Sequence, residues 1–218
     1  MAYTPDFSVL LTPGASFVPG WDGGSAVIGP IELEKAVLPT GRVVGCDPLV
    51  FPESPAYTVA VEPGSYPLIA WVAVFSAEGV ERDRRNAALE LRVSDAATVS
   101  WEMALTDADS DVEGLGPDGF FGYGVDAGCG TLADEAGLRP LKEWDFDRTE
   151  DVLIGEMDWE GPVNGLAAAV TDPATGANVV LVGSGYGDGA YPTFIGRDAE
   201  GNVTRFVTDF LLMPEDCE

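Results

Sequence analysis

Histidine is absent from this chain of 218 residues. Its absence excludes the Ser-His-Asp and Cys-His relays of nucleophilic catalysis and the metal centres that depend on imidazole ligands. General acid or base chemistry would have to come from carboxylates, tyrosine or lysine. Lysine is scarce as well, since Lys35 and Lys142 are the two lysines among 11 basic residues.

Cysteine is rare, and its number is odd: Cys46, Cys129 and Cys217. They form no CxxC pair and no even set, so we expect neither a zinc site nor a disulfide framework. Cys46 precedes Asp47 and Pro48, and we interpret it as buried and unreactive because no activating group accompanies it.

Long apolar runs are also missing. No stretch approaches the roughly 18 apolar residues of a membrane-spanning helix. The first residues lack the basic region and apolar core of a signal peptide. We therefore expect a cytoplasmic protein with reduced thiols and no membrane partner.

Negative charge is present in large excess, with 37 acidic against 11 basic residues and a net charge of −26. Such a charge repels phosphates, so nucleic acid is not expected as a partner. Three interpretations remain: a solvated surface typical of a host with acidic or salt-adapted proteins, attraction of a basic protein partner, and cation binding by clustered carboxylates. Because 46% of the residues are hydrophobic, the chain can bury a core and is not a disordered acidic tail.

Short apolar stretches separated by turn residues fill most of the chain. Residues 1–38, rich in Pro and Gly, are expected to be an irregular lead-in, and residues 39–218 a single β-rich domain. Residues 132–159 are the one helical candidate. Alternation of apolar and polar residues predicts strands over 57–62, 87–93 and 99–105. The short link between the last two predicts a hairpin. We therefore expect a mainly β fold, a sandwich or barrel-like domain with a short helical insertion.

A Gly-x-Tyr-Pro element occurs twice, at residues 64–67 and 189–192. The residue before a proline favours extended backbone, and glycine permits tight turns. We expect the two copies to take comparable positions, each with a glycine closing a turn, a tyrosine packed beside it and a proline starting a strand.

Glycine-rich turns that carry aspartate suggest a binding site. Asp47 follows Gly45-Cys46, Asp126 precedes Ala127-Gly128-Cys129, and Asp188 lies in the glycine-dense run 183–189. Glycine lets a ligand approach the backbone closely, and we expect these turns to converge at one end of the sheet. The ligand-binding candidates are Asp47, Asp126, Asp188, Tyr66, Tyr186 and Tyr191.

Each of these candidates also has a structural interpretation. Aspartate commonly accepts hydrogen bonds from turn amides, and the tyrosines of the glycine run can pack on the sheet. No cofactor is predicted. A divalent cation such as magnesium, calcium or manganese would find carboxylate ligands here, with Asp126 and Asp188 as the candidates.

Asp107, Asp109 and Asp111 alternate in one acidic loop, a spacing known from calcium-binding loops. Gly114 falls where no EF-hand glycine should, and the bidentate glutamate of such a loop is missing. We interpret the segment as a solvated loop.

Several stretches of the chain resemble the bacterial family of unknown function DUF4241; they are residues 39–48, 63–67, 101–105, 121–128, 184–192 and 207–210. The resemblance extends over residues 39 to 210. It implies one domain and a bacterial cytoplasmic origin. No reaction is established for this family, so the resemblance assigns a catalytic role to no residue of this chain.

Two hypotheses for the function follow. The first is an acidic interaction protein without enzymatic activity, an immunity or antitoxin-like inhibitor that charge steers toward a basic partner. Such a protein needs no catalytic residues, which matches the absence of histidine. The alternative is a carboxylate-based enzyme, or a binder of a small ligand or divalent cation, that uses the Gly/Asp turns. Neither the choice between them nor the oligomeric state follows from the sequence.

Overall fold

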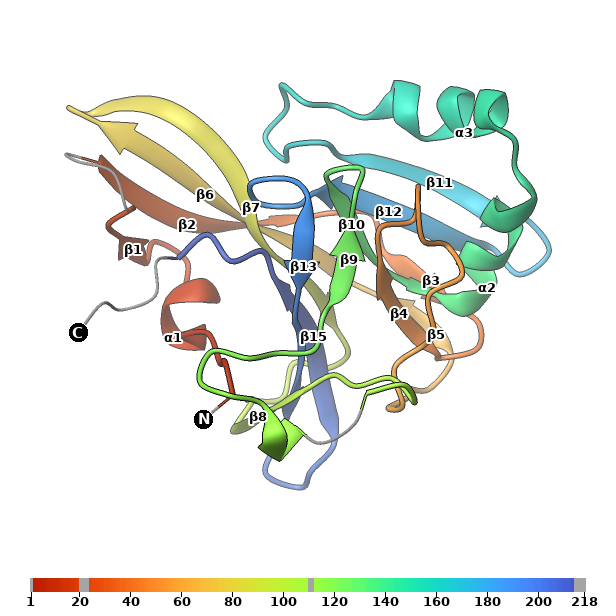
Figure 1. The fold of residues 1–218 in the computed structure, drawn as a ribbon, viewed down its shortest axis with the longest axis horizontal. Helices are drawn as coiled ribbons and strands as arrows, with labels where there is room; N and C mark the ends of the chain where they lie inside the picture. The colour runs from red at the N-terminus through yellow and green to blue at the C-terminus, as the bar shows by residue number, and fades with distance from the viewer. Residues whose placement is uncertain (1, 20–23, 110–111, 214–218) are drawn as a thin grey trace.

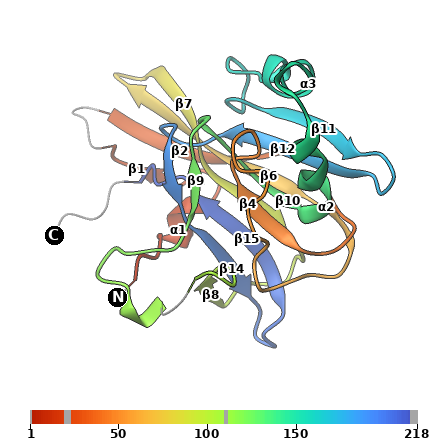
Figure 2. The ribbon, with the colours of Figure 1, turned by 45° about the vertical axis from the view of Figure 1, so that its right-hand side comes forward.

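The structure is a computed structural model that describes residues 2–19, 24–109 and 112–213. Asp111 and Cys217, both discussed above, lie outside these ranges, as do residues 1 and 20–23 of the expected lead-in. Two facing β-sheets dominate the described part (Figures 1 and 2). The mainly β fold class is therefore confirmed.

The larger sheet has seven strands in the order β1-β2-β6-β7-β15-β14-β8 and is curled (Figure 1). Its strands are β1 (Ser16–Phe17), β2 (Gly24–Glu32), β6 (Leu68–Ala77), β7 (Val80–Arg92), β8 (Ser100–Met103), β14 (Thr193–Arg197) and β15 (Val203–Asp209). Neighbouring strands are antiparallel throughout. Register shifts after Trp71 and Phe75 interrupt the β6–β7 ladder, and such bulges increase the local twist of a sheet.

The smaller sheet has four strands in the order β11-β12-β10-β4. Its strands are β4 (Val43–Cys46), β10 (Cys129–Asp134), β11 (Ala167–Asp172) and β12 (Ala177–Gly183). Two short ladders connect the layers: β3 (Ala36–Leu38) with β5 (Gly64–Tyr66), and β9 (Tyr123–Val125) with β13 (Gly189–Tyr191).

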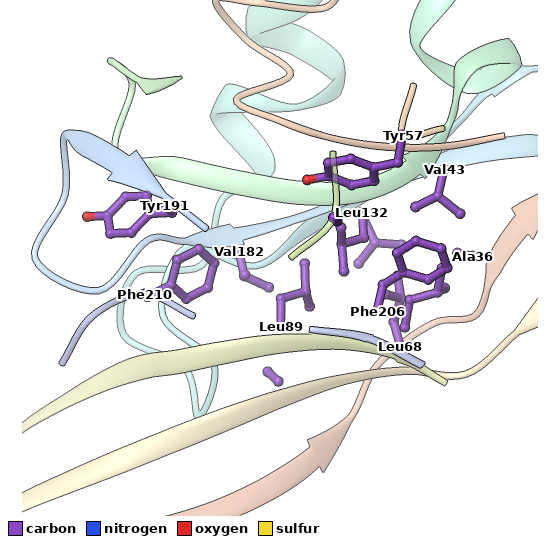
Figure 3. Packing of buried hydrophobic residues seen from close by; sticks show 14 of the residues in the cluster. Ala36, Val43, Tyr57, Leu68, Leu89, Leu132, Val182, Tyr191, Phe206 and Phe210 are labelled. Carbon is purple, nitrogen blue, oxygen red and sulfur yellow. The ribbon is translucent and has the colours of Figure 1, made fainter. Parts of the chain in front are cut away.

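The main core lies between the two sheets. In Figure 3, Leu68, Leu89 and Phe206 point from the larger sheet toward Leu132 and Val182 of the smaller one. Each of these five side chains is fully buried. Burial of a large apolar side chain contributes roughly 1.5–3 kcal/mol, so this cluster fixes how the sheets pack.

Short helices and the N-terminal segment cover the outer faces. Helix α1 (Phe7–Leu10) packs on the outer face of the larger sheet, where Leu10, Trp71 and Phe75 share a second cluster. The outer face of the smaller sheet is covered by α2 (Glu135–Leu138), η2 (Arg139–Glu143), α3 (Phe146–Val152) and η3 (Ile154–Glu156). A further short helix, η1 (Val112–Gly114), lies in the acidic loop. In the described ranges, no helix has the length and apolar character needed to cross a membrane.

The helical insertion is confirmed, within narrower limits than 132–159. Residues 132–134 belong to β10, where Leu132 pairs with Gly45 of β4. The strand ends because the Asp134 carboxylate accepts a hydrogen bond from Ala136 N (2.8 Å) and so caps α2. The apolar residues before Asp134 are compatible with either a helix or a strand. They form a strand because they pair with β4.

Three other local predictions were wrong. The lead-in is not irregular throughout, because Gly24–Glu32 forms β2 and pairs with β6 along its length. The strands predicted over 87–93 and 99–105 exist, but they form no hairpin, because β15 and β14 lie between β7 and β8. Residues 57–62 form no strand. Their alternation still reflects packing, since Tyr57, Val59 and Val61 all contact the main core.

The two Gly-x-Tyr-Pro elements take comparable positions, as predicted. Each Gly-x-Tyr forms a three-residue strand, β5 or β13. The Tyr66 hydroxyl donates to Glu62 O (2.5 Å), and the Tyr191 hydroxyl donates to Gly187 O (2.6 Å), in each case four residues earlier in the chain. Each tyrosine thereby folds back over its own element, and a strand of the larger sheet, β6 or β14, begins two residues later.

Candidate functional site

The candidate aspartates meet at the turn that follows β9. Asp47 lies just after β4 and is fully buried. Its Oδ2 atom accepts hydrogen bonds from the amides of Asp126 (3.0 Å) and Ala127 (2.7 Å). Its Oδ1 atom accepts one from the amide of Leu49 (3.0 Å). These donors stabilise a carboxylate that would otherwise be very unfavourable in the interior.

Asp188 completes this arrangement from the opposite segment. Its Oδ1 atom accepts a hydrogen bond from Gly128 N (3.1 Å). The consecutive amides of residues 126–128 therefore donate to two carboxylates, and we name this group, with Asp47 and Asp188, the aspartate clamp. Asp47, Asp126 and Asp188 are thus brought together as predicted. Their role in binding a ligand stays a prediction.

The geometry of the clamp differs from that of a cation site. Both oxygens of Asp47 face N–H groups, whose positive partial charges occupy the directions from which a cation would approach. Asp126 and Asp188 have exposed side chains. No group of three or more His, Cys, Asp or Glu side chains in the described ranges is placed to hold a metal ion. The clamp therefore fits a structural role, joining β4 to the β9–β10 turn.

Two thiols lie beside the clamp. Cys46 and Cys129 are buried and free, and Cys129 Sγ lies 3.6 Å from Asp47 Oδ1. Burial and, second, the charge of Asp47 raise the pKa of both thiols. Both stay protonated at neutral pH and are poor nucleophiles, which agrees with the interpretation of Cys46 as unreactive.

The candidate tyrosines do not share one site. The hydroxyl of Tyr191 holds the glycine-dense loop through Gly187 O, and burial raises the pKa of this hydroxyl. Tyr186 is exposed at 60%, with the Arg85 guanidinium 5.0 Å from its ring centroid. Tyr66 lies on the separate β3–β5 ladder, and within the described residues no hydrogen bond joins it to the aspartates.

A different part of the molecule concentrates exposed negative charge. Residues 143–160, which include α3 and η3 on the outer side of the smaller sheet (Figure 2), carry eight carboxylates and one basic residue, Arg148. We name this segment the acidic face. Its carboxylates are Glu143, Asp145, Asp147, Glu150, Asp151, Glu156, Asp158 and Glu160.

The carboxylates of the acidic face have no cationic partners in the described part of the chain. Six arginines form ion pairs elsewhere, with Glu81, Asp83, Glu90, Glu102 and Glu135. Arg148 lies over the Trp144 ring instead, 4.3 Å from its centroid. The arginines therefore pair with carboxylates of β7, β8 and α2, and none of them forms an ion pair with a described carboxylate of the acidic face.

Two aromatic side chains are exposed within the acidic face. Phe146 is 71% exposed at the start of α3, and Trp159 is 49% exposed after η3. Trp159 also lines a hollow of about 450 Å³, together with Glu81 and Arg84 of β7. Exposed aromatic side chains surrounded by charge are typical of the anchors of protein interfaces.

The acidic face was not singled out from the sequence, where the segment was recognised as a helical candidate alone. Because 37 acidic residues are spread along the chain, a local excess is hard to recognise. The available signal was the shortage of basic residues, since Arg148 alone stands among the eight carboxylates.

Comparison with known proteins identifies the family of this chain but assigns it no activity. No curated protein matches the chain, and no solved structure matches it. A family model described as a protein of unknown function (DUF4241) matches residues 36–208, close to the 39–210 expected from the motifs. The match covers most of the 218 residues, and the chain therefore belongs to the DUF4241 family.

Proposed function

We propose that this protein is an acidic interaction protein that binds a basic protein partner through its acidic face. The observation that carries this proposal is a set of eight carboxylates around the exposed Phe146 and Trp159, none of which forms an ion pair with a cation among the residues that the structure describes. In functional terms the protein is an inhibitor of the immunity or antitoxin type, which neutralises its partner by covering a basic surface.

Electrostatics favours this arrangement for recognition. Like charges on one face repel one another, and a basic partner would relieve that repulsion while its approach is accelerated by the net charge of −26. The two aromatic side chains would supply the apolar contact that charge alone does not provide. Binding of this kind weakens as ionic strength rises.

The alternative, an enzyme or ligand binder that uses the Gly/Asp turns, has less support. Asp47 already accepts three backbone hydrogen bonds, and Asp188 accepts one from Gly128. A buried carboxylate that holds the backbone together on both oxygens, as Asp47 does, has few free positions for a substrate or a cation.

The test begins with native mass spectrometry of the protein purified from its own host at low ionic strength, which identifies the retained partner. The Kd for that partner is then measured for wild type and for a variant of the acidic face, D147N/E150Q/D151N/E156Q. These four side chains have no capping role. At about 0.5 kcal/mol for each of the four surface charges, the variant should bind roughly 30-fold more weakly.

A matched control changes the net charge equally: E34Q/E62Q/D95N/E113Q, four exposed carboxylates outside the acidic face. We expect its Kd to stay within about threefold of wild type, because exposed charges distant from an interface are largely screened. If both variants weaken binding equally, net charge explains the binding, and the proposal that the acidic face is the binding surface is wrong. Absence of a basic partner at low ionic strength would overturn the proposal itself.

A further inference from the structure

A small cavity lies where four distant segments of the chain meet. Its volume is about 150 Å³, and its wall includes Gly45 of β4, Tyr57, Asp109, Tyr123 of β9 and Thr193 of β14. It shares no residue with the acidic face or with the aspartate clamp. Three of the stretches that resemble the DUF4241 family contribute Gly45, Ala104 and residues 121–124 to this wall.

Aromatic rings form one side of the cavity. Tyr57 and Tyr123 close over Gly45 so tightly that any side chain there would collide with both of them. The Tyr123 hydroxyl is buried and points into the core, where a methyl group at Gly130 would lie 2.5 Å from it. The ring of Tyr123, and not its hydroxyl, is therefore what a ligand in the cavity would meet.

Three hydroxyl groups around the cavity have already donated their protons. Tyr57 donates to Thr193 Oγ1 (2.7 Å), Thr106 donates to Asp109 Oδ2 (2.8 Å), and Ser54 donates to Phe51 O (2.9 Å). A hydroxyl has one proton to donate and two lone pairs. What these three groups still offer to a ligand is lone pairs. The Thr193 hydroxyl is already engaged by Tyr57 and by Thr208 Oγ1 (2.9 Å), so the side-chain hydroxyls of the wall offer mainly acceptors.

Asp109 adds a negative charge to these acceptors. Its Oδ2 atom accepts from the amide and hydroxyl of Thr106 (2.7 and 2.8 Å), which fixes the orientation of the half-buried carboxylate. Its Oδ1 atom accepts no hydrogen bond from any residue that the structure describes, and the lining includes no lysine or arginine. A carboxylate oxygen with free lone pairs attracts a positively charged donor.

We propose that this cavity binds an organic cation, a guanidinium or primary ammonium group, between Asp109 and the rings of Tyr57 and Tyr123. Such a group supplies N–H donors to these acceptors, pairs with the carboxylate and interacts favourably with the aromatic rings. The cation could belong to a free small molecule or to the side chain of a protein, and both sources present the same chemistry. The proposal does not rest on the acidic face.

The test is a titration followed by NMR, at constant ionic strength, with methylguanidinium and n-butylammonium as probes. Their neutral counterparts, methylurea and n-butanol, are titrated in parallel. We expect the cations to shift the ring resonances of Tyr57 and Tyr123, and the neutral molecules to bind at least tenfold more weakly. Equal binding of the neutral molecules, or unchanged ring resonances at saturating cation, would overturn the proposal.

Two variants with the same change of charge locate the site. Asp109→Asn should weaken cation binding at least tenfold, whereas Asp107→Asn, exposed and outside this cavity, should leave it unchanged. Equal loss in both variants would contradict a specific site. If Asp109→Asn does not fold, the wild-type ring shifts with charged and neutral probes decide the question alone. Binding of acetyl-arginine amide as tight as that of methylguanidinium indicates a protein side chain as the source, and its exclusion indicates a free small molecule.

Discussion

The buried carboxylate of Asp47 accepts a hydrogen bond from the backbone amide of Asp126, which lies 79 residues further along the chain. The contact joins the end of β4 to the turn between β9 and β10. An aspartate that looks like a candidate ligand in the sequence is thus placed where the backbone needs an acceptor. The aspartate clamp can be tested directly by mutation.

Asp47→Asn should destabilise the fold by about 2–4 kcal/mol. Asparagine keeps one acceptor oxygen but turns an NH2 group toward amides that also donate, and unpaired buried donors are unfavourable. Urea unfolding measures the change in the free energy of unfolding. Asp188→Asn is the comparison, and its effect should stay within about 1 kcal/mol because Asp188 is exposed and asparagine suits the same turn. Equal effects of the two substitutions would contradict the clamp.

The two Gly-x-Tyr-Pro tyrosines should differ in how much their hydroxyl groups stabilise the protein. Tyr191 is buried at 5% exposure, so Tyr191→Phe removes a protected hydrogen bond and should reduce stability by about 1 kcal/mol. Tyr66→Phe should reduce it by less than about 0.5 kcal/mol, because water can replace the lost donor at Glu62 O. Thermal melting of both variants checks the order, and a larger loss for Tyr66→Phe would contradict it.

Stability should also depend on the protonation of Asp209, which accepts hydrogen bonds from the Tyr3 hydroxyl (2.6 Å) and Leu211 N (2.9 Å). Burial raises the pKa of its carboxyl from 3.8 to about 6. Between these values the folded chain holds a proton that the unfolded chain has released. The contribution of Asp209 therefore favours folding at low pH, and stability falls as pH rises through about 6.

The expected change from this group is roughly 2–3 kcal/mol between pH 4 and pH 7.5, at 1.36 kcal/mol for each pKa unit. Other carboxylates act in the opposite direction, so the quantity to compare is the difference in the free energy of unfolding between wild type and Asp209→Asn. That difference should shift in favour of the variant as pH rises. A constant difference across this range would show that Asp209 does not titrate as described.

Gly45 should not tolerate a side chain, because a methyl group there would meet the Tyr57 hydroxyl and the Tyr123 ring. Gly45→Ala should reduce stability by roughly 1–3 kcal/mol through overpacking. Gly29→Ala in β2 is the control: no atom lies within 4 Å of a methyl group there, so stability should be unchanged or raised by up to about 1 kcal/mol. Urea unfolding of both variants gives the comparison, and a tolerated Gly45→Ala would contradict the tight closure of the rings.

The sequence indicated individual strands better than it indicated their partners. Alternation located the strands containing Leu89 and Trp101 but paired them with each other, because a short link suggests a hairpin. In the fold Leu89 pairs with Thr208 and Trp101 with Gly196, and such choices depend on packing between residues far apart in the sequence.

The Pro and Gly content of residues 1–38 misled in a similar way, because it suggested an irregular segment. Gly29 and Pro30 belong to these residues, yet both lie within β2. Pro30 is tolerated because β1 pairs with β2 only at Ala26 and Val27, which leaves β2 an edge strand at the proline. An edge position does not need the hydrogen bond that proline lacks.

For the site, the Gly/Asp turns correctly predicted that Asp47, Asp126 and Asp188 would converge. Their exposure could not be predicted, since burial of Asp47 depends on the packing of β4 against β10. The acidic face is likewise a property of the fold, which pairs six arginines elsewhere.

Hydrogen–deuterium exchange tests most directly whether the acidic face is the binding surface. The protein is compared alone and saturated with the basic partner identified by native mass spectrometry. We predict that amides of residues 143–160, including α3 and the segment around Trp159, become protected in the complex, while the β3–β5 ladder exchanges as before. Protection elsewhere with unchanged exchange across residues 143–160 would contradict the account.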